Sequence, residues 1–356
     1  MNIKQKSKKT VFLAVLLAAV AALLFLNGCG SKKETKAAGS TYDIAVFVPG
    51  VVAGSPLYEQ MVAGVKQAAA EKTNITVKVL EAGFNQGEWK EKLMSLAAEK
   101  KYELIVSENG AMPYVALPVA KAFPGQKFLF VDAVIKPQKQ MYTLLYNQVE
   151  EGYLVGYLGG LITKSSMKGA NTDLKIGLIA GQEFPAMTQM IVPGYKKGAL
   201  AADPRIKVDY RVLGNWYDAN KARELAKSMI DSGVDVILAI CGGANQGVLT
   251  AAKESGVYVL YFDSEQYALA PGTIAGCVTL TQKEAVHKLV LQAYNGTLPW
   301  GTNRIVGVKE GYVRFAGDNA LYIKTVPESI RARMLEKVKA LKNGSLVLRV
   351  PEFWKN

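Results

Sequence analysis

Phe128-Leu129-Phe130-Val131-Asp132 and Val259-Leu260-Tyr261-Phe262-Asp263 are the two stretches that decide the fold. Each is an apolar run of strand length that ends in an aspartate. The two aspartates lie 131 positions apart, and each closes a similar series of apolar runs and helical patterns. This distance is too long for one repeat of a solenoid, and it indicates a duplicated α/β lobe.

Strand and helix patterns alternate in both series. In the first series we expect strands at 44–48, 76–80, 104–106 and 128–131, with helices at 58–71, 89–100 and 115–122. In the second we expect strands at 176–179, 207–212, 236–240 and 259–262, with helices at 187–201, 219–231 and 247–255. Short strands joined by helices form parallel βαβ units, so the sequence predicts two parallel sheets flanked by helices.

The N-terminal segment has the pattern of an export signal. Four lysines precede an apolar run from Val11 to Leu26, and Asn27, Gly28 and Cys29 follow. A basic head, a short apolar core and a small-residue exit are typical of a signal peptide, and a cysteine at this position is the acceptor of a lipobox. We expect a signal peptide at 1–28, lipid on Cys29 and a flexible tether at 29–40. The protein would then be anchored to the cell membrane and exposed to the periplasm or the exterior. The alternative is an uncleaved anchor with a chance cysteine.

Composition argues against several classes of protein. The formal net charge is +13, but lysines are mixed with glutamates and form no basic run interleaved with aromatics, so we expect no nucleic-acid partner. The single histidine, His287, lies in a helical pattern and is expected at a helix surface, with no metal site and no catalytic residues. Cys241 and Cys277 end apolar runs, and buried free thiols are favoured, although export would also permit a disulfide.

Candidate binding residues follow the expected strands. In open α/β sheets ligands collect at the carboxyl ends of strands, and two facing lobes would bring two sets of ends to one cleft. Aromatic, amide and carboxylate side chains there suit a planar heterocycle with polar edges, although any one aromatic could equally cap a lobe core. The candidates are Tyr58, Asn85, Ser107, Glu108, Asn109, Asp132, Asn147, Phe184, Trp216, Gly242, Gly243, Asp263 and Gln266.

Four segments carry a family resemblance. They are Asn-Gln-Val-Glu-Glu-Gly-Tyr-Leu-Val-Gly-Tyr-Leu at 147–158, Asp-Val-Ile at 235–237 with Gly-Gly at 242–243 and Gly-Val at 247–248, Phe-Asp-Ser-Glu-Gln at 262–266 with Ala-Pro-Gly-Thr at 270–273, and Gly-Val-Lys-Glu-Gly-Tyr-Val at 307–313. They resemble the basic-membrane-protein, or PnrA-like, substrate-binding lipoproteins of ABC importers, and the likeness extends over nearly all of the chain after the signal.

This resemblance implies a periplasmic-binding-protein type I fold with two lobes and a hinged cleft. The expected first lobe is 41–147 plus 276–300, and the expected second lobe is 148–275 plus 301–356. The protein would act as a monomer with the permease and ATPase subunits of an importer.

The resemblance also bears on the ligand. In the family's nucleoside binders aromatics sandwich the base, while carboxylates and a lysine hold the ribose, and Asp132, Trp216, Gly242 and Asp263 match ligand positions. The family's Asp-Asp-x-Ser-Phe-Asn segment is replaced here by residues 53–58, and Leu280 or Thr281 stands where the lysine is expected. These departures, together with the family's riboflavin-binding members, favour riboflavin as transported ligand rather than cofactor, because its uncharged ribityl chain requires no lysine. A purine nucleoside is the alternative.

An enzyme and a ligand-sensing ectodomain are the rival classes. The glycine-rich run at 242–247 lacks the lysine and spacing of a P-loop, and there is no Gly-x-Ser-x-Gly elbow. Gly152, Gly156 and Gly160 mimic a membrane dimerisation motif, but the apolar run around them ends at Lys164 and is too short to span. We therefore expect these glycines to allow close packing of a helix against a sheet.

Overall fold

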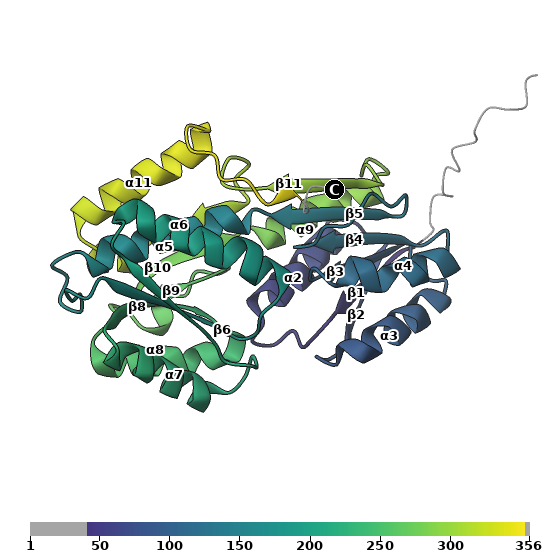
Figure 1. Cartoon of the computed structure of the whole chain (residues 1–356). Helices are drawn as coiled ribbons and strands as arrows, with labels where there is room; N and C mark the ends of the chain where they lie inside the picture. Colours follow the sequence, from purple (N-terminus) through teal and green to yellow (C-terminus); the bar gives the residue numbers. More distant parts are fainter. Residues whose placement is uncertain (1–40, 353–356) are drawn as a thin grey trace, which may run out of the picture. The chain divides into compact units, whose positions relative to one another are not determined.

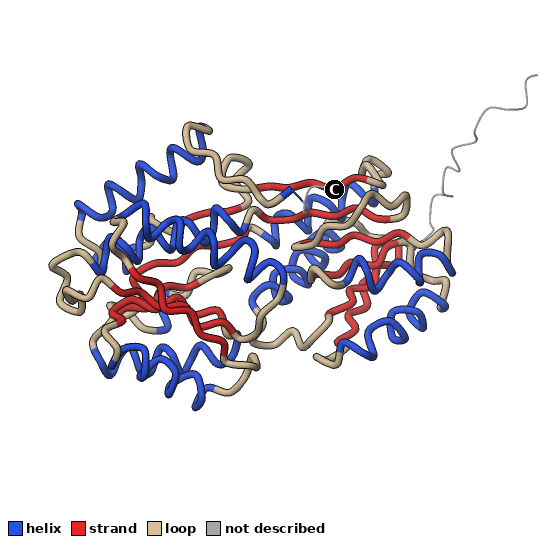
Figure 2. Tube along the Cα trace, viewed as in Figure 1, coloured by secondary structure: helices blue, strands red, loops and turns tan. Residues whose placement is uncertain are grey.

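The computed structural model describes residues 41–352. The expected signal peptide, the lipidation site Cys29 and the tether lie outside the described residues. The described strands form two six-stranded sheets with helices on their faces (Figure 2). Between residues 41 and 352, no helix combines the length and apolar character that a membrane span needs. The two-lobed α/β fold is confirmed.

The first lobe is built on an all-parallel sheet of strand order β11-β5-β4-β3-β1-β2. The strands are β1 Tyr42–Val48, β2 Ile75–Glu81, β3 Leu104–Glu108, β4 Lys127–Val131, β5 Met141–Tyr146 and β11 Thr302–Val306. The helices are α2 Pro56–Ala70, α3 Gln86–Ala98, α4 Met112–Ala122 and α9 Gln282–Tyr294.

Both faces of this sheet are covered, and β1 shows why. Successive side chains of a strand point to opposite faces. Val46 lies in one core with Met61 of α2, whereas Phe47 lies in a second core with Leu93 of α3. Strands buried on both faces are near-continuous apolar runs, which is why β1 and β4 are recognisable in the sequence.

The second lobe has strand order β12-β10-β9-β8-β6-β7, and only the β10–β12 pair is antiparallel. The strands are β6 Lys175–Ala180, β7 Lys207–Val212, β8 Val234–Ile240, β9 Tyr258–Tyr261, β10 Ile274–Leu280 and β12 Val313–Phe315. The helices are α5 Gln148–Thr163, α6 Val192–Ala202, α7 Ala219–Asp231, α8 Asn245–Ser255, α10 Ala320–Thr325 and α11 Glu328–Asn343. Three short turns complete it: the π-helix η1 Met187–Ile191 and the 3-10 helices η2 Gly242–Ala244 and η3 Tyr267–Leu269.

The chain passes between the two sheets three times, after β5, after β10 and after β11. Two expected boundaries are wrong. Residues 276–280 belong to β10, which pairs with β9 in the second sheet, whereas 302–306 form β11, which pairs with β5 in the first. Backbone pairing with distant strands sets these crossings, and local sequence carries little of that information.

The expected helix at 187–201 begins as the π-helix η1 and becomes α-helical only at Val192. The expected helix at 115–122 begins earlier, at Met112, because Pro113 occupies the first turn, where its missing N–H costs nothing. The strands β5, β10, β11 and β12 were not predicted.

Glycines set the packing of α5, every residue of which is buried. A Cβ on Gly152 would lie 2.6 Å from the carbonyl oxygen of Ile191, and one on Gly156 would lie 2.0 Å from that of Tyr195. The backbone of α5 therefore lies directly against η1 and α6, side by side with it in Figure 1. The expected packing of these glycines against a sheet is wrong, although Gly159 does face the sheet.

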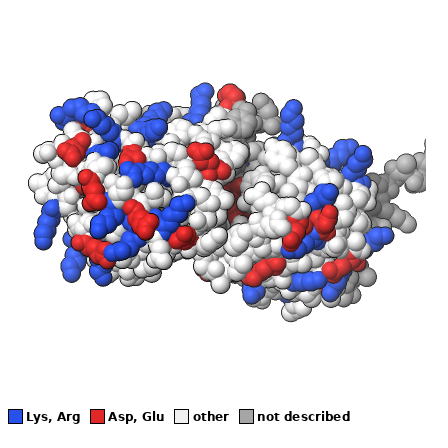
Figure 3. Space-filling model, turned by 60° about the horizontal axis from the view of Figure 1, so that its bottom comes forward, with Lys and Arg blue, Asp and Glu red and all other residues white. Residues whose placement is uncertain are grey.

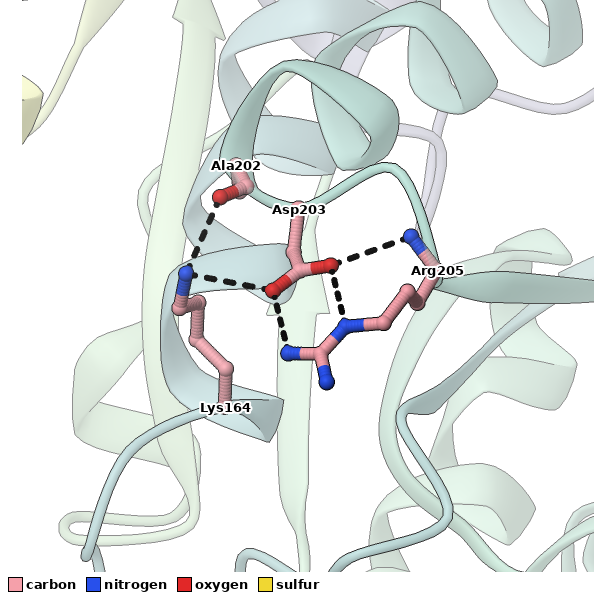
Figure 4. A network of polar contacts seen from close by, with 4 residues as sticks. All are labelled: Lys164, Ala202, Asp203 and Arg205. Atoms are coloured by element: carbon pink, nitrogen blue, oxygen red, sulfur yellow. Dashed lines mark hydrogen bonds and ion pairs between the residues drawn. The ribbon is translucent and has the colours of Figure 1, made fainter.

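A polar network ties together the C-terminal ends of α5 and α6 (Figure 4). Asp203 accepts hydrogen bonds from Arg205 Nη2 at 2.8 Å and Nε at 3.0 Å, and Lys164 Nζ lies 3.3 Å from its carboxylate. Lys164 also donates to the carbonyl of Ala202 at 3.2 Å. Hydrogen bonds from Arg205 hold the pKa of Asp203 well below its usual range.

The expectation of buried free thiols is confirmed. Cys241 and Cys277 are buried free thiols, and burial raises the pKa of each to about 12. His287 is half-buried on α9, where its Nε2 lies 2.7 Å from Oε1 of Glu71 at the end of α2.

Candidate ligand-binding site

Two aspartates follow equivalent strands in the two lobes. Asp132 comes directly after β4 with φ +49°, and Asp263 follows β9 with φ +65°. A positive φ is uncommon outside glycine, and aspartate is among the side chains that tolerate it best. Both turns therefore present a carboxylate at the carboxyl end of a parallel sheet, where ligands of open α/β folds bind.

Four acids gather at these strand ends, and we call Glu108, Asp132, Glu151 and Asp263 the carboxylate cluster. Burial raises the pKa of Glu108 well above its usual range, and the charges of Asp132 and Asp263 raise it further. Burial also raises the pKa of Asp132 to about 7 and that of Asp263 to about 8. Since Glu108 and Asp132 belong to the first sheet and Asp263 to the second, the cluster joins both lobes.

Few groups within the protein satisfy this cluster. Gln148 Nε2 donates to both oxygens of Asp132, at 3.1 and 3.3 Å, and the backbone N–H of Asp263 donates to Glu151 Oε1 at 3.2 Å. Oδ1 of Asp263, Oε2 of Glu151 and the hydroxyl of Tyr146 are buried without a hydrogen-bond partner. In the described range, no ion pair reaches these four acids, and no group of acids, histidines or cysteines is arranged to hold a metal ion. The cluster can therefore accept hydrogen bonds from a bound molecule that carries donors.

The surface of residues 41–352 agrees with this arrangement. Figure 3 shows Lys and Arg scattered among Asp and Glu, and it shows carboxylate side chains at the bottom of a recess. The expectation that the basic residues form a solvated surface rather than one basic patch fits the face in view.

An aromatic pair lies at the strand ends of the second lobe. The rings of Phe184 and Trp216 have centroids 6.2 Å apart and planes inclined at 45°. Trp216 rests on Gly181, where a Cβ would lie 2.4 Å from the indole, and its Nε1 donates to Oε1 of Gln182 at 3.0 Å. Gly242 has φ +59°, and a Cβ there would lie 3.1 Å from the carbonyl oxygen of Trp216. The structure thus brings together three residues that the sequence singles out.

A second aromatic pair lies in the first lobe. Tyr58 and Phe84 both pack against Gly50, where a Cβ would lie 2.8 Å and 2.9 Å from their rings. The hydroxyl of Tyr58 donates to the carbonyl of Pro49 at 3.2 Å. Burial raises the pKa of Tyr58, the charge of Glu108 raises it further, and a hydrogen bond with Asn109 opposes the shift. Tyr58 and Asn109 therefore lie beside the carboxylate cluster.

Three predicted site residues have polar atoms engaged within the protein. Asn85 caps α3, where its Oδ1 accepts from the N–H of Gly87 and its Nδ2 donates to Glu88. Asn147 Nδ2 donates to the carbonyl of Leu348 at 2.8 Å, and Gln266 Nε2 lies 3.3 Å from Ser264 Oγ. None of these bonds reaches the carboxylate cluster, so a ligand contact of Asn85, Asn147 or Gln266 stays a prediction.

Three residues of the site are missing from the sequence-based candidates: Phe84, Gln148 and Glu151. Glu108 ends β3 and follows from the same strand-end rule as Asp132. Gln148 and Glu151 lie on a helix, so that rule does not reach them. Their one sequence signal is a group of polar residues at the start of an otherwise apolar helix.

Two parallel α/β lobes that meet at their strand ends around unsatisfied acids and aromatic rings define a solute-binding protein. Residues 41–344 match the family model of PnrA-like ABC transporter substrate-binding proteins, and the chain belongs to this family. The family consists of solute-binding proteins of ABC transporters rather than enzymes.

Relatives and solved structures agree with this assignment. The chain is 29% identical over 241 residues to the ABC transporter nucleoside-binding protein BmpA of Lactococcus lactis, which covers 63% of this chain and 66% of BmpA. It is 25% identical over 373 residues to the CD4+ T-cell-stimulating antigen of Listeria innocua, with 97% and 99% covered. An ABC transporter solute-binding protein from Aeropyrum pernix shares the fold, with a TM-score of 0.74 and 18% identity over 87% of this chain and 94% of that one.

Proposed function

We propose that this protein captures riboflavin between its lobes and delivers it to the permease and ATPase subunits of an importer, while lipid on Cys29 holds it at the membrane. The observation that carries the proposal is the carboxylate cluster, which has aromatic pairs of both lobes at the neighbouring strand ends and no cation paired with it in the described residues. A flat ring system would stack on the aromatic side chains, and a neutral polyol chain would donate to the carboxylates.

The make-up of the cluster argues against a phosphorylated ligand. A phosphate there would find no cation of the described residues to pair with, and it would repel each acid of the cluster that is ionised. Hydroxyl groups, by contrast, donate hydrogen bonds to carboxylates, and such charge-assisted bonds are stronger than neutral ones. The ribityl chain of riboflavin offers hydroxyls alone, whereas flavin mononucleotide would bring a phosphate.

A purine nucleoside is the second candidate, because BmpA of Lactococcus lactis is named as a nucleoside-binding protein. Its base could stack on the same rings, and its ribose hydroxyls could reach Asp132 or Asp263. The two residues that stand where the family's ribose-binding lysine is expected argue for riboflavin instead. Leu280 is buried at the end of β10, and the hydroxyl of Thr281 donates a hydrogen bond to the carbonyl of Gly311.

Calorimetric titration with riboflavin, flavin mononucleotide, guanosine and inosine tests the proposal. We expect tight binding of riboflavin and at least about tenfold weaker binding of flavin mononucleotide, a difference of about 1.4 kcal/mol or more. Heat with a nucleoside and none with riboflavin would refute the first candidate and establish the second.

A further inference from the structure

The first turn of α5 contacts the strand-end aspartates of both lobes. The helix begins at Gln148, directly after the first crossing between the sheets. Gln148 donates to the carboxylate of Asp132, and Glu151 accepts from the backbone N–H of Asp263. Residues three positions apart share one face of a helix, so one turn reaches both aspartates.

We propose that Gln148 and Glu151 are positioning residues for ligand capture, which fix Asp132 of one lobe and Asp263 of the other to a single helix turn at the interlobe crossing. The proposal rests on the proposed function in so far as it takes the two aspartates as ligand-binding residues. Neither positioning residue needs to touch the ligand.

The burial of the two side chains supports this role. Gln148 is 3% exposed and Glu151 is 0% exposed, and each keeps one buried oxygen without a hydrogen-bond partner. A buried polar group that is only partly satisfied destabilises a fold, so an apolar residue would serve packing better at either position. The bonds to the aspartates are what an apolar residue would not supply.

The first turn of α5 belongs to a helix that is tightly packed against its neighbours. Gly152 and Gly156 let the α5 backbone lie against η1 and α6, with no space for even a methyl group. Such close backbone packing restricts movement of α5 relative to η1 and α6. The first turn of α5 can therefore hold the two carboxylates at a constant separation before a ligand arrives.

The groups that face Glu151 give it the character of a hydrogen-bond donor. Asp263 faces it from the loop after β9, Asp132 from the loop after β4 and Tyr146 from the end of β5. Burial raises the pKa of Glu151 well above its usual range, and the charges of Asp263 and Asp132 raise it further. A protonated Glu151 would have a donor to offer the Asp263 carboxylate, and glutamine in its place would offer its amide.

The test uses the full chain and three variants, Gln148→Ala, Glu151→Ala and Glu151→Gln, each titrated with riboflavin and with guanosine. We expect the two alanine variants to bind the probe that the wild type binds about tenfold or more weakly. We expect Glu151→Gln to bind within about threefold of wild type, because its amide restores the donor. Glu284→Gln, an exposed glutamate in the first turn of α9, is the matched control.

A second readout needs no ligand. An acid whose pKa is raised by folding makes the fold less stable as pH rises, so the Tm of the unliganded wild type should fall between pH 5 and pH 8. The fall should be smaller in Glu151→Gln and unchanged in the control. A purely structural role would lower the Tm of Glu151→Gln equally at both values.

The outcomes separate the two proposals. If the wild type binds guanosine and not riboflavin, the ligand proposal fails, and the guanosine titrations still test the positioning residues. The inference is overturned if either alanine variant binds like the wild type, if Glu151→Gln loses as much affinity as Glu151→Ala, or if its Tm shows the wild-type dependence on pH.

Discussion

The substitution Asp263→Asn should stabilise the unliganded protein at pH 8 and leave it almost unchanged near pH 4. Asparagine keeps the size of the side chain and tolerates the left-handed backbone at φ +65°, so the change removes a charge and little else. Burial first, and the charge of Asp132 second, raise the pKa of Asp263 to about 8 in the fold. In the unfolded chain an aspartate titrates near 3.9, about four units lower.

The sign and size of the effect follow from this difference. Between the two pKa values the folded protein holds a proton that the unfolded chain has lost, so stability is greatest in acid and falls as pH rises through about 8. The fall is about 1.4 kcal/mol per pH unit, or about 4 kcal/mol from pH 5 to pH 8 for an isolated group. Because the cluster shares its protons, we expect asparagine to recover roughly 2–3 kcal/mol at pH 8.

Urea unfolding at pH 5 and pH 8 measures the effect. Asp318→Asn is the matched control, because the Asp318 side chain is 81% exposed. We expect wild type and control to lose stability together as pH rises, and Asp263→Asn to lose markedly less. If Asp263→Asn is destabilised equally at both pH values, or if the stability of the wild type does not fall, the buried acidic cluster is refuted.

Three further predictions each depend on the surroundings of one or two residues. Trp216→Ala should weaken riboflavin binding about tenfold or more in a fluorescence titration, because it removes a stacking face worth roughly 1 kcal/mol beyond buried area. Gly156→Ala should lower the free energy of unfolding by about 3 kcal/mol or more in urea, because its methyl group would lie 2.0 Å from the carbonyl oxygen of Tyr195. Cys241 and Cys277 should react with a thiol reagent only as fast as the protein unfolds, since burial raises the pKa of both.

The two substitutions each have a control in the chain. Tyr217 follows Trp216 and is 79% exposed, so Tyr217→Ala should bind riboflavin like the wild type. Gly125→Ala meets no atom within 4 Å and should change stability by about 0.5 kcal/mol or less. Wild-type affinity for Trp216→Ala, wild-type stability for Gly156→Ala, or fast labelling of the folded thiols would contradict the respective contact.

The sequence predicts buried strands such as β4 and also the partly exposed edge strands β2 and β7, but it does not predict the buried strands β5 and β10. β4 and β9 are apolar throughout and end in an aspartate, so strand type, parallel topology and duplication could all be deduced. The strand β11, Thr-Asn-Arg-Ile-Val, is a half-polar edge strand that pairs with β5 far away in the sequence. Nothing local marks such a strand. The omission of β11 and the omission of β10 each placed one lobe boundary wrongly.

The residues of the site were likewise predictable only in part. Strand ends are positions that topology fixes, which is why Asp132 and Asp263 could be proposed before the structure was known. Glu151 could not, because a buried acid on a helix looks like a surface residue until its neighbours are known. Asn85 had a visible alternative, since Asn85 and Glu88 have the spacing of a helix capping box and the structure uses Asn85 as the cap.

A crystal structure of the protein with riboflavin tests the central claim most directly. The account predicts that the isoalloxazine ring lies on Trp216 of the second lobe and faces Tyr58 of the first, with ribityl hydroxyls within hydrogen-bond distance of Asp132 or Asp263. A flavin bound away from the carboxylate cluster, or a cluster that makes no hydrogen bond to the ligand, would contradict it.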